Sequence, residues 1–144
     1  MSLTGTYDPD NVFARILRGE LPAVKVFEDD RILAFMDVFP QSEGHVLVIS
    51  KVSQARNLIE AEPEIVAELA QATQRIAAAM PAALGCEGVS IMQFNGAAGG
   101  QTVFHLHFHA IPRWSDRTVG QHGEGQMADI DDLQTAARKI ADRL

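Results

Sequence analysis

Apolar and polar positions recur with two different periods along the chain, and the two periods predict different elements. Runs in which apolar residues dominate or alternate predict strands, and these runs cover residues 24–28, 31–37, 45–50, 89–95 and 101–111. Apolar residues at helical spacing predict a short helix after Asn11, a long helix from Pro63 to Gly85, and a final helix over residues 129–144. We expect Pro81 to distort the end of the long helix and Pro112 to end the fifth strand.

The order of these elements predicts an α+β fold. A short helix precedes three strands, and a long central helix separates them from two further strands and a C-terminal helix. The Asp29-Asp30 step joins the first two strands as a hairpin, so we expect a mostly antiparallel five-stranded sheet. We predict a single domain over residues 1–144, with its core in residues 11–114 and an extension over 115–144. The polar residues 1–10 are expected to be loosely held at their very end.

Composition limits the partners and the compartment. The chain has 144 residues, of which 47% are hydrophobic, and this fits one ordinary globular domain. A net charge of −7 disfavours a nucleic acid polymer as partner, although it does not exclude a single nucleotide. The only cysteine is Cys86, so an intrachain disulfide framework is excluded. Because no apolar run approaches the roughly 18 residues that span a bilayer and the N-terminus has no signal pattern, we expect a soluble, cytoplasmic protein without a membrane partner.

Three of the five histidines occupy alternate positions of one predicted strand. His105, His107 and His109 stand in the segment HLHFHAIPR. On a strand their imidazoles would share one face about 6.6 Å apart, while the opposite face would present Leu106, Phe108 and Ala110 to the core. A row of imidazoles opposes its own protonation, because each charge would lie beside another. The row therefore indicates a functional site, whereas His122 lies in a glycine-rich stretch and is expected to be solvated.

Two chemistries fit such a row: a transition-metal site and nucleophilic catalysis. The residues that precede the row favour the second. In the segment NGAAGGQT, Gly99 and Gly100 let backbone N–H groups approach an anion, and Gln101 and Thr102 add neutral donors. These donors suit phosphoryl oxygens rather than a cation. We therefore predict a site for a phosphoryl group, with no metal ion.

The same segment resembles the signature of a known family. Residues 95–113, NGAAGGQTVFHLHFHAIPR, are similar to the signature of the histidine triad (HIT) family of nucleotide hydrolases and transferases. The resemblance extends upstream in the family's order and spacing, through residues 12–23, 26–30, 34–38 and 44–49. It covers about residues 11–114, and it implies a HIT-like fold and a homodimer.

The resemblance implies catalytic roles for four histidines. His107 matches the family's nucleophile, which attacks the α-phosphorus of a nucleotide and forms a covalent nucleotidyl-histidine. His105 and His109 match the flanking histidines that contact phosphate oxygens and support proton transfer, and His45 matches a fourth histidine of that relay. A nucleophilic imidazole must be neutral, and adjacent imidazoles favour the neutral form.

Other positions match the family's nucleotide pocket. Asp37 matches the carboxylate that receives the ribose hydroxyls, while Gln101 and Thr102 match a polar pair near the phosphate, with threonine in place of an expected serine. The surroundings of base and sugar are matched by Val12, Phe13, Ile16, Phe35, Val38 and Asn95. The implied substrate is an AMP-type purine nucleotide in a phosphoramidate, a dinucleoside polyphosphate or an acyl-adenylate. The alternative is a non-enzymatic nucleotide sensor or interaction protein that retains the pocket.

The chain departs from the family at a zinc-ligand pattern that occurs in many bacterial members. Where those members have a CxxC pair and a later histidine, this chain has Asn11, Ala14 and Ser53. None of these side chains replaces a thiolate or an imidazole as a zinc ligand. We therefore predict no structural zinc, and no cofactor is implied.

Overall fold

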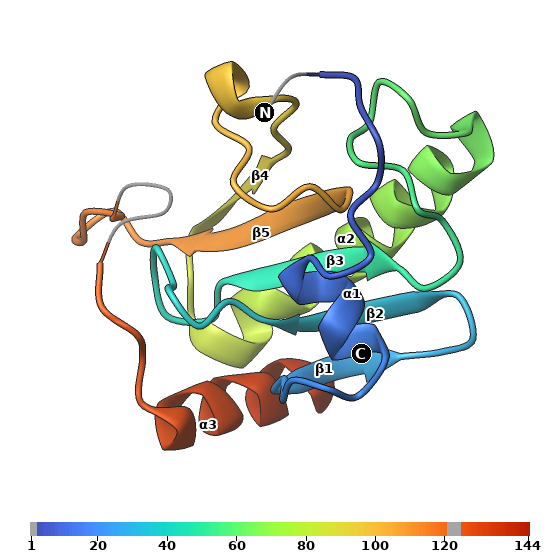
Figure 1. The fold of residues 1–144 in the computed structure, drawn as a ribbon. Helices are drawn as coiled ribbons and strands as arrows, with labels where there is room; N and C mark the ends of the chain where they lie inside the picture. The colour runs from blue at the N-terminus through green and yellow to red at the C-terminus, as the bar shows by residue number, and fades with distance from the viewer. Residues whose placement is uncertain (1–2, 121–124) are drawn as a thin grey trace.

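The computed structural model of the chain describes residues 3–120 and 125–144, so His122 lies outside the described residues. Within them, helices and strands follow the predicted order (Figure 1). The elements are α1 (Val12–Leu17), β1 (Lys25–Glu28), β2 (Ile32–Met36), β3 (Val46–Ser50), α2 (Pro63–Leu84), β4 (Gly88–Met92), the 3₁₀ turn η1 (Ala97–Gly99), β5 (His107–Arg113) and α3 (Ile130–Ala141). The predicted α+β class is confirmed.

The five strands form one antiparallel sheet in the order β1-β2-β3-β5-β4. Strand β5 therefore lies inside the sheet, between β3 and β4, although it comes last in the chain. In the register of β3 with β5, Ile49 lies opposite His107 and Leu47 opposite His109. This pairing carries two of the histidines to the middle of the sheet.

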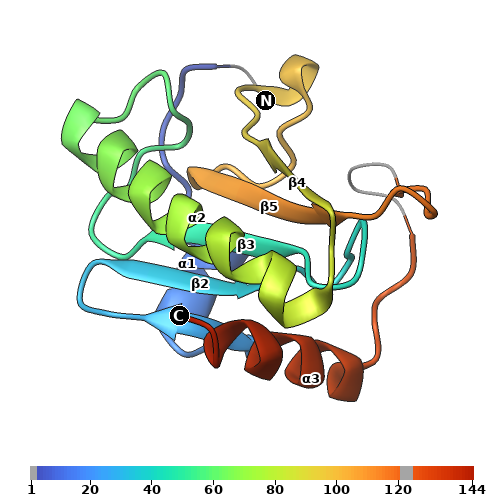
Figure 2. The same cartoon turned by 180° about the vertical axis from the view of Figure 1, so that it is seen from behind.

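Helices cover both faces of the sheet. The long helix α2 crosses one face (Figure 2), and the short helix α1 lies on the other (Figure 1). The main core lies on the α2 side, where buried side chains include Leu69, Ile76, Met80, Val48 and Phe108. Full burial of each such large side chain stabilises the fold by about 1.5–3 kcal/mol. A second cluster, built from Phe13, Leu33, Phe35, Leu47 and Ile49, fixes α1 against the opposite face.

Each helix begins at a residue that the sequence suggests for that purpose. The side chain of Asn11 accepts a hydrogen bond from the Ala14 N–H at 2.9 Å, which caps α1. Pro63 occupies the first turn of α2, where a backbone N–H would have no hydrogen-bond partner within the helix. The side chain of Asp129 accepts from the Asp131 N–H at 2.8 Å and caps α3. At the other end of α2, Gly85 adopts φ 70°, a left-handed conformation that glycine reaches without strain.

Two predictions about the bounds of β5 are wrong. Strand β5 begins at His107 rather than at residue 101, because the preceding residues hydrogen-bond to a neighbouring loop instead of a strand. Pro112 lies within β5 opposite Val89. The pairing of β3 with β5 extends only as far as Ala110, so β3 needs no N–H donor from position 112. Pro81 lies inside α2, which continues to Leu84 and ends at Gly85 as predicted, and the distortion at Pro81 stays a prediction.

Candidate functional site

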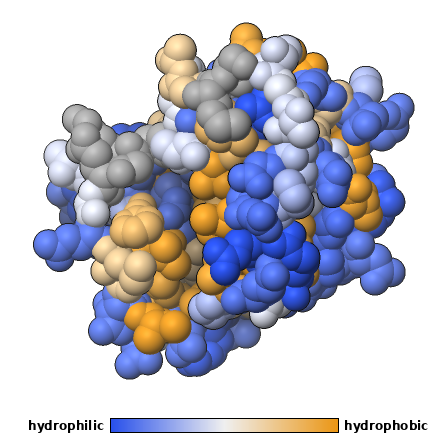
Figure 3. Space-filling model, viewed as in Figure 1, coloured by the Kyte–Doolittle hydropathy of each residue, from blue (hydrophilic) through white to orange (hydrophobic). Residues whose placement is uncertain are grey.

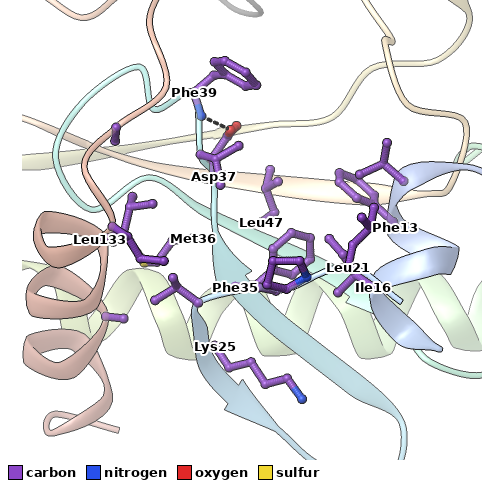
Figure 4. Close-up of a pocket in the computed structure, with 18 of the residues that line it drawn as sticks. Phe13, Ile16, Leu21, Lys25, Phe35, Met36, Asp37, Phe39, Leu47 and Leu133 are labelled. Carbon is purple, nitrogen blue, oxygen red and sulfur yellow. Dashed lines mark hydrogen bonds between the residues drawn. The ribbon is translucent and has the colours of Figure 1, made fainter. Parts of the chain in front are cut away.

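A cavity of about 1080 Å³ opens on the sheet face that carries α1. Its walls come from α1 on one side and α3 on the other, and β1, β2, β3 and β5 form its floor (Figure 4). Hydrophobic residues gather around the hollow between the two helices (Figure 3). Polar side chains are few, and they include His107, His109, Asp37 and Thr102. An apolar cavity with a small number of convergent polar groups is typical of a small-molecule site.

The imidazole of His107 is held in one tautomer by the backbone. Its Nδ1 lies 2.7 Å from the carbonyl oxygen of His105. Because a carbonyl only accepts, Nδ1 must donate, and the neutral ring therefore carries its lone pair on Nε2. The edge of the Phe13 ring packs perpendicular to the imidazole, at a centroid distance of 4.9 Å. The ring of His107 is thus both oriented and chemically defined.

His45 and His109 form a hydrogen-bonded pair with the opposite pattern. The backbone N–H of Gln41 donates to Nδ1 of His45 at 3.0 Å, so the neutral His45 ring carries its proton on Nε2. That Nε2 lies 2.9 Å from Nδ1 of His109 and 3.5 Å from Oδ2 of Asp37. His109 accepts at Nδ1, and its own proton is therefore on Nε2. The rings of His107 and His109 are 4.9 Å apart, so a lone pair and an N–H group lie side by side in the cavity wall.

His105 is placed differently from the sequence prediction. It precedes β5 and is not part of that strand, and it does not line the cavity, although its ring, like that of His107, contacts the ring of Phe13, with centroids 6.4 Å apart. Nε2 of His105 donates to the Ser50 carbonyl at 3.2 Å, and Nδ1 lies 2.7 Å from the hydroxyl of Tyr7. Burial lowers the pKa of His105 from 6.5 to about 4, so the ring is neutral at pH 7. Its contact with His107 is made through its backbone carbonyl.

Most of the predicted nucleoside-pocket residues meet in the cavity. Asp37 follows β2 directly and lines the cavity, and its Oδ1 accepts the Phe39 N–H at 2.8 Å (Figure 4). Thr102 lies in the wall as well. The apolar side chains of the predicted set that line the cavity are Val12, Phe13, Ile16, Phe35 and Val38.

The other predicted residues of the glycine-rich segment do not line the cavity. Gln101 is 4% exposed; its Oε1 accepts the Gly96 N–H at 2.9 Å, and its Nε2 donates to two backbone carbonyls, those of Arg56 and Val103. Asn95 accepts the Leu58 N–H at 2.9 Å. These amides hold the loop itself, because every buried donor in it needs a partner. The cavity lining likewise does not include Gly99 and Gly100.

Sequence reasoning missed the part of the cavity formed by α3. One face of this helix lines the cavity through Ile130, Leu133, Gln134, Ala137 and Arg138. The apolar stripe at Ile130, Leu133, Ala137 and Ile140 predicted a packed helix, but spacing alone does not tell which surface it packs against. The residues that lead into β1 were missed as well; they are Leu21, Pro22, Ala23, Val24 and Lys25.

One group of side chains in the described part of the chain brings three candidate metal-ligand atoms close together. Atoms of Asp37, His45 and His109 lie within 4.8 Å of one another. The facing nitrogens of His45 and His109 are already hydrogen-bonded to each other, and an ion between them would displace that bond. At the position of the family's zinc pattern, Asn11 caps α1 and Ser53 accepts the Ala55 N–H at 3.1 Å. The absence of a metal stays a prediction.

Comparison with known proteins assigns the family. The HIT domain model matches residues 18–116. The adenylylsulfatase HINT3 of Arabidopsis thaliana is 37% identical over 83% of this chain, which spans only 63% of that relative. The protein hit of Bacillus subtilis is 35% identical over 92% of this chain and 93% of its own length. The chain therefore belongs to the HIT family of nucleotide-binding hydrolases and transferases.

Solved structures show the same fold over nearly the whole chain. A Hit-like protein involved in cell-cycle regulation from Bartonella henselae is 42% identical and superposes with a TM-score of 0.90, covering 97% of this chain and 100% of that one. A zinc-bound histidine triad family protein from Mycobacterium smegmatis is 32% identical with a TM-score of 0.80, covering 93% and 92%. Within the described residues, none of the helices has the length and apolar character that a membrane span requires.

Proposed function

We propose that the protein cleaves a phosphoanhydride or phosphoramidate linkage of an AMP-type nucleotide, with His107 as the nucleophile. The observation that carries this proposal is the hydrogen bond between Nδ1 of His107 and the His105 carbonyl, 2.7 Å long. It places the lone pair of the neutral imidazole on Nε2. A nucleophile needs that lone pair at the moment of attack.

The reaction proceeds in two displacements. Nε2 of His107 forms a bond to the α-phosphorus while the bond from phosphorus to the leaving group breaks and the leaving group takes up the Nε2 proton of His109. Water then attacks the same phosphorus and returns a proton to His109, and the phosphorus–nitrogen bond breaks with the electron pair returning to Nε2 of His107. If another acceptor replaces water, the same intermediate gives transfer rather than hydrolysis. Covalent capture divides one difficult displacement into two easier ones.

His109 and His45 support charge and proton movement at this centre. His109 carries its proton on Nε2, next to the nucleophile, and this N–H is a fixed donor for an oxygen on phosphorus. As His109 gives up that proton, its Nδ1 accepts more strongly from His45. Asp37 Oδ2, 3.5 Å from His45 Nε2, favours the His45 tautomer that carries its proton on Nε2.

The remaining cavity residues form the nucleoside pocket. With phosphorus over β5, the rest of the nucleotide extends over β3 and β2, where the cavity floor includes Leu47 and Phe35. Phe13 and Ile16 from α1 offer an apolar wall for the base. The Asp37 carboxylate at the end of β2 is the acceptor for the vicinal ribose hydroxyls. The name of the adenylylsulfatase relative supports an adenylyl group as the part that the enzyme retains.

Turnover of adenosine 5′-phosphoramidate tests this function. The purified protein is incubated with the substrate, with and without an excess of EDTA, and AMP is measured by chromatography. We expect AMP release at the same rate under both conditions, because the proposed nucleophile is an imidazole. Abolition of turnover by EDTA would instead show a metal-dependent reaction. Tight AMP binding without turnover of phosphoramidate, diadenosine polyphosphate or acyl-adenylate would identify a nucleotide sensor.

A further inference from the structure

The N-terminal segment before α1 is attached to the loops that surround the histidines. The carbonyl of Leu3 accepts from Nδ2 of Asn57 at 2.8 Å. A Cβ atom added to Gly5 would lie 3.2 Å from the guanidinium of Arg56, and one added to Gly96 would lie 3.1 Å from the side chain of Leu3. In Figures 1 and 2 this segment passes the end of the sheet at which β5 begins. The expectation of a loosely held very end concerns residues 1–2, which lie outside the described residues, whereas from Leu3 onward the segment makes these contacts.

The segment reaches the histidine row through Tyr7. The hydroxyl of Tyr7 lies 2.7 Å from Nδ1 of His105, and the two rings meet edge to face with centroids 5.8 Å apart. Nε2 of His105 carries a proton because it donates to the Ser50 carbonyl. In the neutral ring Nδ1 is therefore an acceptor, and Tyr7 is its donor. His105 is 2% exposed, so water does not replace that donor readily.

The peptide group that follows His105 controls the tautomer of His107. Its carbonyl accepts the Nδ1–H of His107 at 2.7 Å, and its N–H, which belongs to Leu106, donates to the Ala55 carbonyl at 3.0 Å. The sheet does not hold this peptide group, because the first pair between β3 and β5 is Ile49 with His107. Its orientation depends instead on the Ala55 contact and on the His105 ring, which is anchored at both nitrogens.

We propose that Tyr7 is a positioning residue for the nucleophile: by holding the His105 ring, it keeps the His105 carbonyl aligned with Nδ1 of His107. This role rests on the proposed function of His107, whereas the hydrogen bonds that join Tyr7, His105 and His107 do not depend on that function. Tyr7 lies outside residues 18–116, the part of the chain that the HIT family model matches. The segment of this chain that precedes the family region thus supplies a contact to the histidine row.

Loss of the Tyr7 hydroxyl has a defined consequence. A buried Nδ1 of His105 without a donor favours rotation of the ring, and the adjoining peptide group tilts with it. The Nδ1–H of His107 then loses alignment with its acceptor, and the ring also populates the tautomer with its proton on Nε2. That tautomer has no lone pair directed at phosphorus. Chemistry is slowed, whereas the surfaces that bind the nucleotide are unchanged.

Two readouts on Tyr7→Phe test the proposal. The first is the two-bond ¹H–¹⁵N correlation spectrum of the histidine rings at neutral pH without substrate, which reports each tautomer directly. The second is kcat and KM for adenosine 5′-phosphoramidate. We expect a mixed tautomeric signature for His107, a fall in kcat of about 10-fold and a KM within about two-fold of wild type, in line with a small misalignment at a catalytic group. The amide spectrum of the variant reports whether the fold is intact.

Thr73→Val is the matched control, because it also removes one buried hydroxyl hydrogen bond, from Thr73 to the Leu69 carbonyl at 2.7 Å within α2. It should leave the His107 signature and kcat unchanged. A Tyr7→Phe protein with the wild-type His107 tautomer overturns the proposal, whatever its rate. The spectrum does not depend on turnover, so an inactive wild-type protein would contradict the proposed function alone.

Discussion

At the scale of single residues, backbone groups define the chemistry of the histidines. A backbone carbonyl fixes the tautomer of His107, and the backbone N–H of Gln41 fixes that of His45. The tautomer of His109 follows from that of His45, since one hydrogen bond joins the two rings. A sequence motif shows only which side chains are present, so it does not reveal these backbone partners. The three histidines of the row therefore differ: His107 has its lone pair on Nε2, His109 has an N–H on Nε2, and His105 contributes its backbone carbonyl.

Asp37→Asn tests the ribose contact. The amide oxygen of the variant retains an acceptor for the Phe39 N–H, so the local turn is preserved while the charge is lost. We expect wild-type protein to prefer AMP over its 2′,3′-dideoxy analogue by about 1.5–3 kcal/mol, the range for a hydrogen bond to a charged group. The variant should lose most of this preference in titration calorimetry. An undiminished preference for ribose in the variant would contradict the assignment.

The buried His105 makes stability depend on pH. Its pKa is about 4 in the folded protein and 6.5 in the unfolded chain, so the unfolded chain binds more protons between these values. The contribution of His105 is therefore complete above pH 6.5 and is lost as the pH falls towards 4. The expected slope reaches about 1.4 kcal/mol per pH unit, or about 3 kcal/mol in total.

Urea unfolding at a series of pH values measures this slope, and His105→Gln is the control because it removes the titrating group. Other groups contribute equally to both proteins. The wild-type free energy of unfolding should fall more steeply than that of the variant between pH 6.5 and 4. Parallel curves for the two proteins would show that His105 does not titrate as its burial requires.

At the scale of elements, α3 has two roles, and the helix lies outside residues 18–116, which the family model matches. It packs into the main core through Leu133, Ala136, Ala137 and Ile140, and it forms one wall of the cavity. Its position beside β1 and α2 closes the sheet edge that β1 would otherwise expose. Helix α3, within the predicted extension, is thus part of the fold, and it shapes the cavity.

Two substitutions on α3 separate these roles. Ile140 is completely buried, whereas Ile130 is 57% exposed on the same helix. Ile140→Ala should lower the free energy of unfolding by about 2–5 kcal/mol, because it leaves a cavity in the core. Ile130→Ala should change it by no more than about 0.5 kcal/mol. Equal effects in chemical denaturation would show that α3 is not packed in the core as described.

The sequence predicts elements better than it predicts the site, and the reasons are physical. Periodicity and capping residues such as Asn11 and Pro63 act locally, so the helix starts and the fold class follow from them. The start of β5 does not, because residues before His107 bond to a loop near Ala55 that is distant in the chain. For the same reason the motif could not show that Gln101 bonds to its own loop, or that Tyr7 reaches His105.

At the scale of the whole molecule, the two edges of the sheet differ. Helix α3 packs beside β1 at one edge of the sheet, whereas β4 is the edge strand on the other side. Ile91 on β4 is 47% exposed, which places a large apolar side chain on an edge strand. Edge strands of this kind favour pairing with another chain. We propose that β4 contributes to the homodimer that the family resemblance implies.

Sedimentation of the purified protein measures the assembly. We expect twice the chain mass of 15.7 kDa for the wild type. Ile91→Lys should shift the protein towards a single chain, because a lysine on an edge strand opposes pairing. Ile59→Lys is the control, since Ile59 is 63% exposed but lies in the loop before α2. A wild-type protein that sediments as one chain would contradict the proposal.

The most direct measurement is the identification of the atom that carries the nucleotide during turnover. The protein is mixed with adenosine 5′-phosphoramidate, quenched in alkali, in which a phosphorus–nitrogen bond to imidazole survives, and its peptides are analysed by mass spectrometry. We predict one adenylyl group on His107, none in His107→Ala, and a loss of turnover in that variant on the order of 10⁴-fold. An adenylyl group on any other residue, or wild-type turnover by His107→Ala, would contradict the account.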